Sequence, residues 1–541
     1  MESIYGLPPA SALFVQIVSS NMPFVTPFRV SLTSQCLGCD HRAVIWLKRY
    51  WGLLAVVATV VLLYSLLPLA TALEFGKDEG FEVIKPYLCM KGFVLYKDIW
   101  NDQPPILTIL LTCAFRIGGP TILAARLVAA GFGLVLFAGF FQLVRQRSGT
   151  WTALMATFLL LASPVVLRLS ASVMLETPAF AIGLVSALLL FQWSRQRHWG
   201  WLVASGAVMG IALQVKLTAG LVAPAMLAEI ALTHCCNRNQ NWLRATAQDI
   251  ARWGASVMLI FLAIGMFWAR GSLQSSFRSH FVQRPVAGYG RAEDRVMPPS
   301  DLLRHADGLG AAAIGLVLLV RRKRWRECAF PAVLFLTASA IHAIHRPWWN
   351  YYYLHFAIPL AWLAGVALKE MISAASACLA TPLRLSRNRT WTGLALLALA
   401  ALLLARPERR LEAIMKDLRQ RPTVASSRIV TTMRQYADRT HWAYAERVIY
   451  PFHAQVPVPP ELAVIVLKRF WSGQITDEGI VAACKRYHAE QLILSDTPPA
   501  EWTELLASQY VLACTENDST LYVAKSIYEP TRTSPGKEKQ Q

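Results

Sequence analysis

Long apolar stretches dominate residues 46–405 and are separated by short polar segments. A helix needs about 20 apolar residues to cross a bilayer. The stretches therefore predict about eleven membrane-spanning helices. They begin near Gly52, Thr121, Trp151, Thr177, Trp199, Leu217, Gly254, Leu309, Ala329, Tyr351 and Trp391.

The pattern changes after Arg406. Alternating apolar stretches at Ala463–Leu467, Gln491–Ser495 and Thr520–Ala524 predict strands, with helical segments between them. The fold class expected is an all-α polytopic membrane protein, with a small α/β domain at 406–525 and a disordered polar tail at 526–541.

Composition supports the membrane assignment and narrows the partners. Hydrophobic residues make up 55% of the 541 residues and charged residues only 16%, whereas soluble domains carry about a quarter charged residues. The net charge is +20, but residues 406–541 carry 18 basic against 16 acidic side chains, so the excess lies in the apolar part. No basic cluster is interleaved with aromatic side chains in a polar region, so we expect no nucleic-acid partner.

Basic residues orient the predicted helices. Five groups fall on one side of the membrane if the helices alternate, and basic loops mark the cytoplasmic side. The protein is thus expected in the cell membrane, with residues 1–45 as a cytoplasmic leader of unknown role. The loops at 73–120 and 270–304 and the C-terminal domain are expected outside. The five groups are Arg42, Lys48 and Arg49; Arg145 and Arg147; Arg195 and Arg197; the basic residues of Arg321–Arg326; and Arg384, Arg387 and Arg389.

An acidic pair, Asp78-Glu79, lies at the start of the first outer loop. A carboxylate there could act as a general base that removes a proton from an attacking hydroxyl. Acidic residues near a membrane surface are costly to desolvate and suggest a function when they face a cavity. The alternative is that both acids are ordinary solvated residues of the loop, with the side chains of Lys77 and Lys85 nearby.

The residues that follow the pair give it a context. Asp78-Glu79-Gly80, Lys91-Gly92-Phe93-Val94-Leu95-Tyr96-Lys97-Asp98 and Gln103-Pro104-Pro105-Ile106 occur in order. This series resembles the GT-C superfamily of glycosyltransferases that use polyprenyl-phosphate sugars. The nearest relatives look like protein O-mannosyltransferases, lipid A aminoarabinose transferases and rhizobial lipopolysaccharide galacturonosyltransferases.

The resemblance implies roles for residues of the first two outer loops. Asp78, as the first acid of the pair with Glu79, would be the catalytic base. Many relatives have a basic residue where this chain has Gln103, so Lys97 or arginines elsewhere would have to neutralise the donor phosphate. Glu176 would be a second acid that holds the acceptor or a metal ion, or else an acid that complements a helix start.

Two further segments carry candidate ligands for the donor phosphate. The first, Ser279-His280-Phe281-Val282-Gln283-Arg284, resembles a His-x-x-Arg segment of the aminoarabinose transferases, with the spacing one residue longer. Arg284 is the preferred ligand because a guanidinium binds phosphate at two points. Its competitors are Arg278, Arg291 and Arg295, and the alternative is a basic loop facing lipid headgroups.

The second segment runs from Arg346 to Leu360 and is rich in aromatic residues. It resembles the family's basic residue followed by Tyr-x-Leu, which places Arg346 and Tyr352 within reach of the same phosphate. An aromatic belt at the membrane surface explains most of its tryptophans and tyrosines. Lys216, between two apolar runs, matches a lysine of the relatives but receives no role here.

The function expected is transfer of a sugar from a polyprenyl-phosphate donor to an extracytoplasmic hydroxyl of a glycan, lipid or protein, with inversion. The resemblance leaves a requirement for a divalent cation (Mg or Mn) open. The alternatives are a secondary transporter and a non-catalytic protein of envelope assembly. A transporter would be expected to show related halves and ionisable residues near the bilayer midplane, and the sequence has no visible repeat.

Overall fold

The computed structural model describes residues 41–71, 77–236, 241–268, 306–345, 348–379, 387–420 and 423–529. Two compact units divide the chain, Met1–Trp51 and Gly52–Gln541. The second unit contains every described candidate site residue, and the account below concerns that unit.

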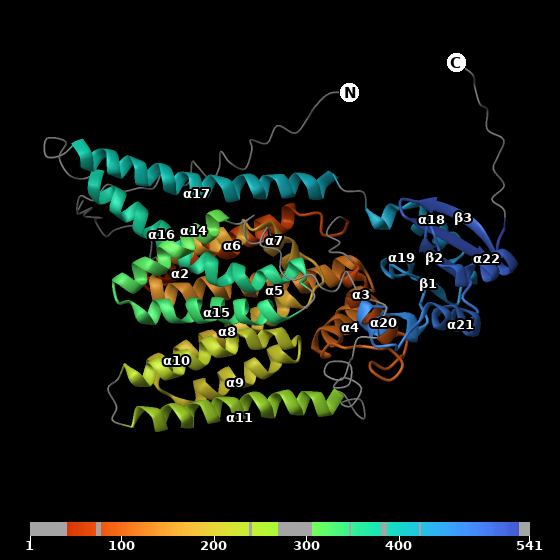
Figure 1. Ribbon diagram of the computed structural model, residues 1–541, viewed down its shortest axis with the longest axis horizontal. Helices are drawn as coiled ribbons and strands as arrows, with labels where there is room; N and C mark the ends of the chain where they lie inside the picture. Colours follow the sequence, from red (N-terminus) through yellow and green to blue (C-terminus); the bar gives the residue numbers. More distant parts are fainter. Residues whose placement is uncertain are drawn as a thin grey trace, which may run out of the picture. The chain divides into compact units, whose positions relative to one another are not determined.

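Long helices form the membrane part, as the apolar stretches predict. In Figure 1, α8 runs beside α9, and α9 beside α11. The helices are α2 (His41–Leu66), α5 (Ile122–Ser148), α6 (Thr150–Leu161), α7 (Pro164–Ala171), α8 (Glu176–Gln196), α9 (Trp199–Leu213), α10 (Ala223–Cys235), α11 (Trp242–Trp268), α14 (Ala306–Arg321), α15 (Trp325–Ile344), α16 (Tyr353–Leu379) and α17 (Arg387–Gln420), with the 3-10 helices η1 (Leu217–Val222) and η2 (Asn350–Tyr352).

Within the described residues, seven helices are long and apolar enough to cross a membrane, or eight if α6 and α7 form one broken span. The break between α6 and α7 bends the chain by 80°. The stretches predicted near Gly52, Trp199 and Leu309 form shorter apolar helices. The predicted polytopic, mostly helical class is confirmed, while the count of about eleven spans stays a prediction.

Close helix packing in this part depends on residues without a side chain. A Cβ added at Gly315 of α14 would lie 1.9 Å from the Leu363 carbonyl oxygen of α16. A Cβ at Gly206 of α9 would lie 2.5 Å from the Trp253 carbonyl oxygen of α11. Small residues allow such backbone contact between membrane helices, where van der Waals packing replaces the hydrophobic effect.

The segment predicted as a long outer loop, 73–120, contains two helices. These are α3 (Asp78–Met90) and α4 (Ile106–Gly118). Between them, Gly92 at φ +98° and Tyr96 at φ +69° turn the chain back on itself. The Tyr96 hydroxyl donates to the Gln103 carbonyl at 2.7 Å, which holds the turn in place.

A four-stranded sheet organises the C-terminal part. Its order is β1-β2-β4-β3, with β1 and β2 parallel and the other pairs antiparallel. The strands are β1 (Ala443–Ala445), β2 (Gln491–Ser495), β3 (Tyr510–Glu516) and β4 (Ser519–Ala524). The helices are α18 (Arg428–Gln435), α19 (Ile449–Ala454), α20 (Leu467–Trp471), α21 (Asp477–Tyr487) and α22 (Thr503–Gln509), with 3-10 turns η3 (Val424–Ser426), η4 (Ala437–Arg439), η5 (Pro460–Leu462) and η6 (Ala500–Trp502).

Both faces of the sheet are buried, which gives an α/β arrangement. Ile493 points into a core with α18, while its neighbours Leu492 and Leu494 point into a core with α21 and α22. The predicted strands at Gln491–Ser495 and Thr520–Ala524 are confirmed. The predicted strand at Ala463–Leu467 is wrong: this segment is irregular and ends in the first residue of α20.

The C-terminal part packs on the α3–α4 region through aromatic residues. Phe452 of α19 stacks on Phe115 of α4 at 5.7 Å between ring centroids, and meets Tyr87 of α3 edge-on at 6.1 Å. The Tyr87 hydroxyl donates to the Gln455 carbonyl at 2.7 Å, and Trp100 Nε1 donates to Gln474 Oε1 at 2.9 Å. The segment that carries Asp78 is therefore attached to the C-terminal part.

Candidate active site

Asp78 and Glu79 form the first turn of α3, where acids face the positive end of the helix dipole. Glu79 is completely buried. Arg126 of α5 donates from Nε to Oε1 and from Nη2 to Oε2, both at 2.9 Å. The Val173 amide adds a bond to Oε1 at 3.0 Å. With both oxygens bound, Glu79 fixes α3 to α5 and is suited to anchoring the helix.

Asp78, in contrast, is partly exposed and lies among other charges. Burial is the largest influence and raises the pKa of Asp78 to about 6. Lys216 opposes this shift, whereas the carboxylates of Glu176, Glu82 and Asp102 reinforce it. A carboxyl group that titrates near neutral pH suits a general base better than an ordinary aspartate does.

Glu176 begins α8 and is completely buried. Its Oε1 accepts a bond from the ammonium group of Lys216, which follows the end of α9. Burial is the largest single influence and would lower the pKa of Lys216, but the charges of Glu176, Tyr352 and Asp78, with the hydrogen bond to Glu176, together raise it. In the part of the chain that the structure describes, Oε2 of Glu176 has no hydrogen-bond partner. A buried oxygen of this kind needs a hydrogen-bond donor, which an ordered water or a substrate hydroxyl can supply.

Aromatic side chains cover the Lys216 ammonium. Its nitrogen lies 5.0 Å from the ring centroid of Tyr351 and 5.8 Å from that of Tyr352, both in η2. The Tyr352 hydroxyl lies 3.4 Å from Nε2 of His345. Tyr352, a predicted site residue, thus belongs to the same cluster as Glu176 and Lys216.

The other two described candidates belong to the segment between α3 and α4. Lys97 is exposed on the turn between α3 and α4. The carbonyl of Gln103 accepts bonds from Tyr96 and from Asn101 Nδ2, the latter at 2.7 Å. Nothing in these contacts tests a role in binding phosphate, so that role stays a prediction for both residues. Arg284, His280 and Arg346 lie outside the described residues.

Sequence reasoning left several members of the cluster without a role. Lys216 is visible as a lone lysine between apolar runs, and Asp102 directly precedes Gln103 in the motif that carries the resemblance. His345 gives no signal, because it joins the cluster only through the fold. Across the residues described, no group of three or more His, Cys, Asp or Glu side chains is arranged to hold a metal ion.

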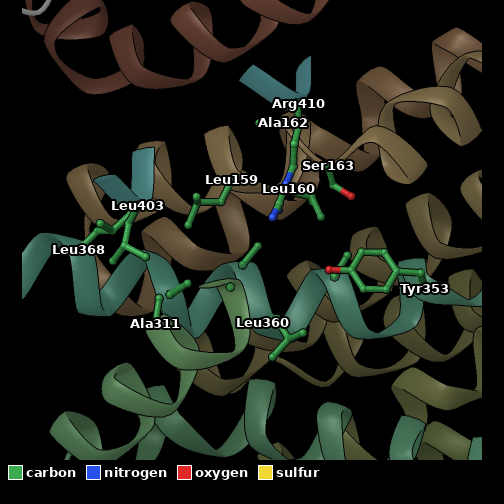
Figure 2. A pocket seen from close by; sticks show the side chains of 14 residues that line it. Leu159, Leu160, Ala162, Ser163, Ala311, Tyr353, Leu360, Leu368, Leu403 and Arg410 are labelled. Carbon is green, nitrogen blue, oxygen red and sulfur yellow. The ribbon is translucent and has the colours of Figure 1, made fainter. Parts of the chain in front are cut away.

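An apolar groove opens between α6, α14, α16 and α17 (Figure 2). Leu159, Leu360 and Leu403 line it, and the guanidinium of Arg410 points into it beside Ser163. A second cavity shares Arg410 and extends to Asn350, the first residue of η2. The groove therefore leads toward the helix that covers Lys216, although Asp78 and Glu176 line neither cavity.

Part of the chain resembles a known protein family. A family model described as dolichyl-phosphate-mannose-protein mannosyltransferase matches residues 102–268. Among curated protein sequences, none matches this chain.

Solved structures with the same fold include membrane glycosyltransferases. ArnT from Cupriavidus metallidurans bound to undecaprenyl phosphate matches with a TM-score of 0.63 at 16% identity, over 89% of this chain and 99% of that chain. The Archaeoglobus fulgidus oligosaccharyltransferase AglB, in complex with an inhibitory peptide and a dolichol-phosphate, matches with a TM-score of 0.50 at 14% identity, over 83% and 70%. The resemblance predicted from the sequence is therefore confirmed: the chain shares the fold of these membrane proteins, and residues 102–268 match a mannosyltransferase family model.

Proposed function

We propose that the protein transfers a sugar from a polyprenyl-phosphate donor to a hydroxyl group on the outer face of the cell membrane. The observation that carries the proposal is the cluster of Asp78, Glu176 and Lys216. It combines a carboxyl group whose pKa is raised to about 6 with a buried acid that has one unpaired oxygen among the described residues.

In the proposed reaction, ionised Asp78 accepts the proton of the acceptor hydroxyl. The hydroxyl oxygen forms a bond to the anomeric carbon of the donor sugar, and the bond from that carbon to the phosphate oxygen breaks. Polyprenyl phosphate leaves with the electron pair, and the anomeric configuration inverts. Glu176 accepts a hydrogen bond from the acceptor through its unpaired oxygen.

The lipid tail of the donor would lie in the apolar groove of Figure 2, which is bounded by helices of the membrane part. Isoprenoid chains are fully apolar, so leucine and alanine side chains suit them. The cavity that continues from Arg410 to Asn350 would let the phosphate end approach η2 and the cluster. This route explains why a sugar transfer needs a membrane core.

The test is transfer from radiolabelled polyprenyl-phosphate sugars to native membrane extract by the purified protein. Asp78→Asn keeps the shape of the side chain but cannot accept the proton, so transfer should fall by ~10²–10⁴-fold. Glu504→Gln, at an exposed position of α22, is the control and should leave transfer unchanged. Normal transfer by a folded Asp78→Asn variant would contradict the assignment of the base.

A further inference from the structure

The cations near Asp78 differ in how freely a ligand could reach them. Arg126 donates from Nε and Nη2 to the two carboxylate oxygens of Glu79. Lys85 donates to Glu82 Oε1 at 2.7 Å and to Asn101 Oδ1 at 3.1 Å. Their side chains are 3% and 2% exposed, and that of Lys216 is 12% exposed. All three are committed to buried carboxylates, so none of them is readily shared with a substrate phosphate.

Lys468 is different because its side chain is 30% exposed. It belongs to α20 of the C-terminal part, and its ammonium lies 3.2 Å from Oδ2 of Asp102. Asp102 directly precedes the uncharged Gln103 in the segment between α3 and α4. An ammonium group has three N–H donors, and this contact uses one of them.

The neighbouring residue, Arg469, fixes the position of α20. Arg469 is buried, and its Nη1 donates to the carbonyl oxygens of Glu461 at 2.8 Å and Val464 at 2.9 Å. Its guanidinium also lies 5.2 Å from the ring centroid of Trp100. The α20 helix is thereby attached to the α3–α4 turn, and the lysine beside Arg469 is held at this edge of the site.

The charges of Asp102 and Lys468 act on residues of the cluster around Lys216. Asp102 lies close enough to Asp78 to raise the pKa of that carboxyl. Lys468 lies close enough to His345, the hydrogen-bond partner of Tyr352, to help burial lower the pKa of the imidazole. A phosphate that approaches η2 therefore comes within the field of Lys468.

We propose that Lys468 binds the anionic phosphate of the lipid donor, so that the C-terminal domain supplies a cation to an active site built by the membrane helices. Asp102 holds the ammonium in position when no donor is bound, and the remaining N–H groups bind the phosphate oxygens. This inference rests on the proposed function and identifies a ligand for its substrate.

The experiment measures binding of undecaprenyl phosphate, and of undecaprenol as the uncharged reference, to the full-length protein in detergent. Lys468→Ala should weaken binding of undecaprenyl phosphate by ~10- to 100-fold, the scale of a lost hydrogen bond to a charged group, and leave undecaprenol binding unchanged. Lys468→Arg should restore most of the affinity. Lys485→Ala, at an exposed position of α21, is the matched control and should bind like the original protein.

Asp102→Asn separates a ligand role from a simple contact between domains. It breaks the same ion pair but frees the lysine, so phosphate binding should be kept or strengthened. Equal losses for Lys468→Ala and Asp102→Asn would overturn the proposal, as would an unchanged affinity of Lys468→Ala. If the original protein binds the phosphate and the alcohol equally well, the proposed function itself fails.

Discussion

Asp78 and Glu79 are consecutive in the chain, but their surroundings make them chemically different. Glu79 is completely buried, and Arg126 and the Val173 amide bind both of its oxygens. Asp78 remains partly exposed beside Lys216 and Glu176, where its pKa rises to about 6. In the proposed mechanism the first acid accepts the proton of the acceptor hydroxyl, whereas the second holds the helix that carries it.

The raised pKa of Asp78 predicts the acid limb of the pH profile. Only the ionised carboxylate accepts a proton, so kcat/KM should fall as the pH drops below about 6, with roughly a tenth of the groups ionised one unit lower. Initial rates between about pH 5 and 8 measure this limb. A rate independent of pH across this range would show that another group is the base.

Glu79→Gln should act on stability rather than on the chemical step. The change leaves the buried guanidinium of Arg126 without its ionic partner, and breaking a buried pair in this way costs about 3–5 kcal/mol. We expect a lower thermal transition and a lower yield of monodisperse protein, with near-normal transfer per folded molecule. Glu504→Gln controls for loss of an exposed carboxylate. A fully stable but inactive Glu79→Gln variant would indicate that Glu79, and not Asp78, acts in the chemical step.

At the scale of elements, a substitution in α16 tests the proposed path of the lipid tail. Ala361→Trp places a large side chain in the groove of Figure 2 and should raise KM for long-chain donors several-fold. Transfer from a short-chain donor analogue should change little, because its tail would not reach the groove. Leu336→Trp, at an exposed position of α15, is the matched control. Equal effects on long-chain and short-chain donors would place the tail elsewhere.

The elements also show what the sequence can and cannot predict. Apolar stretches locate helices well because a membrane helix satisfies its own backbone hydrogen bonds. The strand expected at Ala463–Leu467 is wrong, since its apolar residues pack in two different cores around an irregular segment. The strand β1 was missed because it is three residues long, and its parallel partner β2 lies far along the chain.

In the site, too, the residues of local motifs could be predicted and those joined only by the fold could not. The resemblance named Asp78, Glu176 and Tyr352 as separate candidates, since each occurs in a local motif. The contribution of Lys468 was not predictable, because its contact with Asp102 joins residues 366 positions apart. Such pairings depend on how the C-terminal part packs on α3 and α4, which no local pattern encodes.

At the scale of the whole molecule, the charge of the loops predicts the topology. A reporter at Lys323 should read as cytoplasmic and one at Asp518 as extracytoplasmic, because five basic groups share one side if the helices alternate. Fusions to reporters that are active on only one side of the membrane provide the measurement. A cytoplasmic signal at Asp518 would contradict the expected number of spans and would place the C-terminal part away from the outer face.

The bonds that anchor Glu79 also limit which sequences the first turn of α3 can have. Successive helical residues point about 100° apart, so the bonds to Arg126 set the rotation of α3 about its own axis and hence the direction of Asp78. Exchanging the two acids, by combining Asp78→Glu with Glu79→Asp, would keep composition and charge but lengthen the base and shorten the anchor. The two positions are therefore not interchangeable, and the order of the pair carries information that its net charge does not.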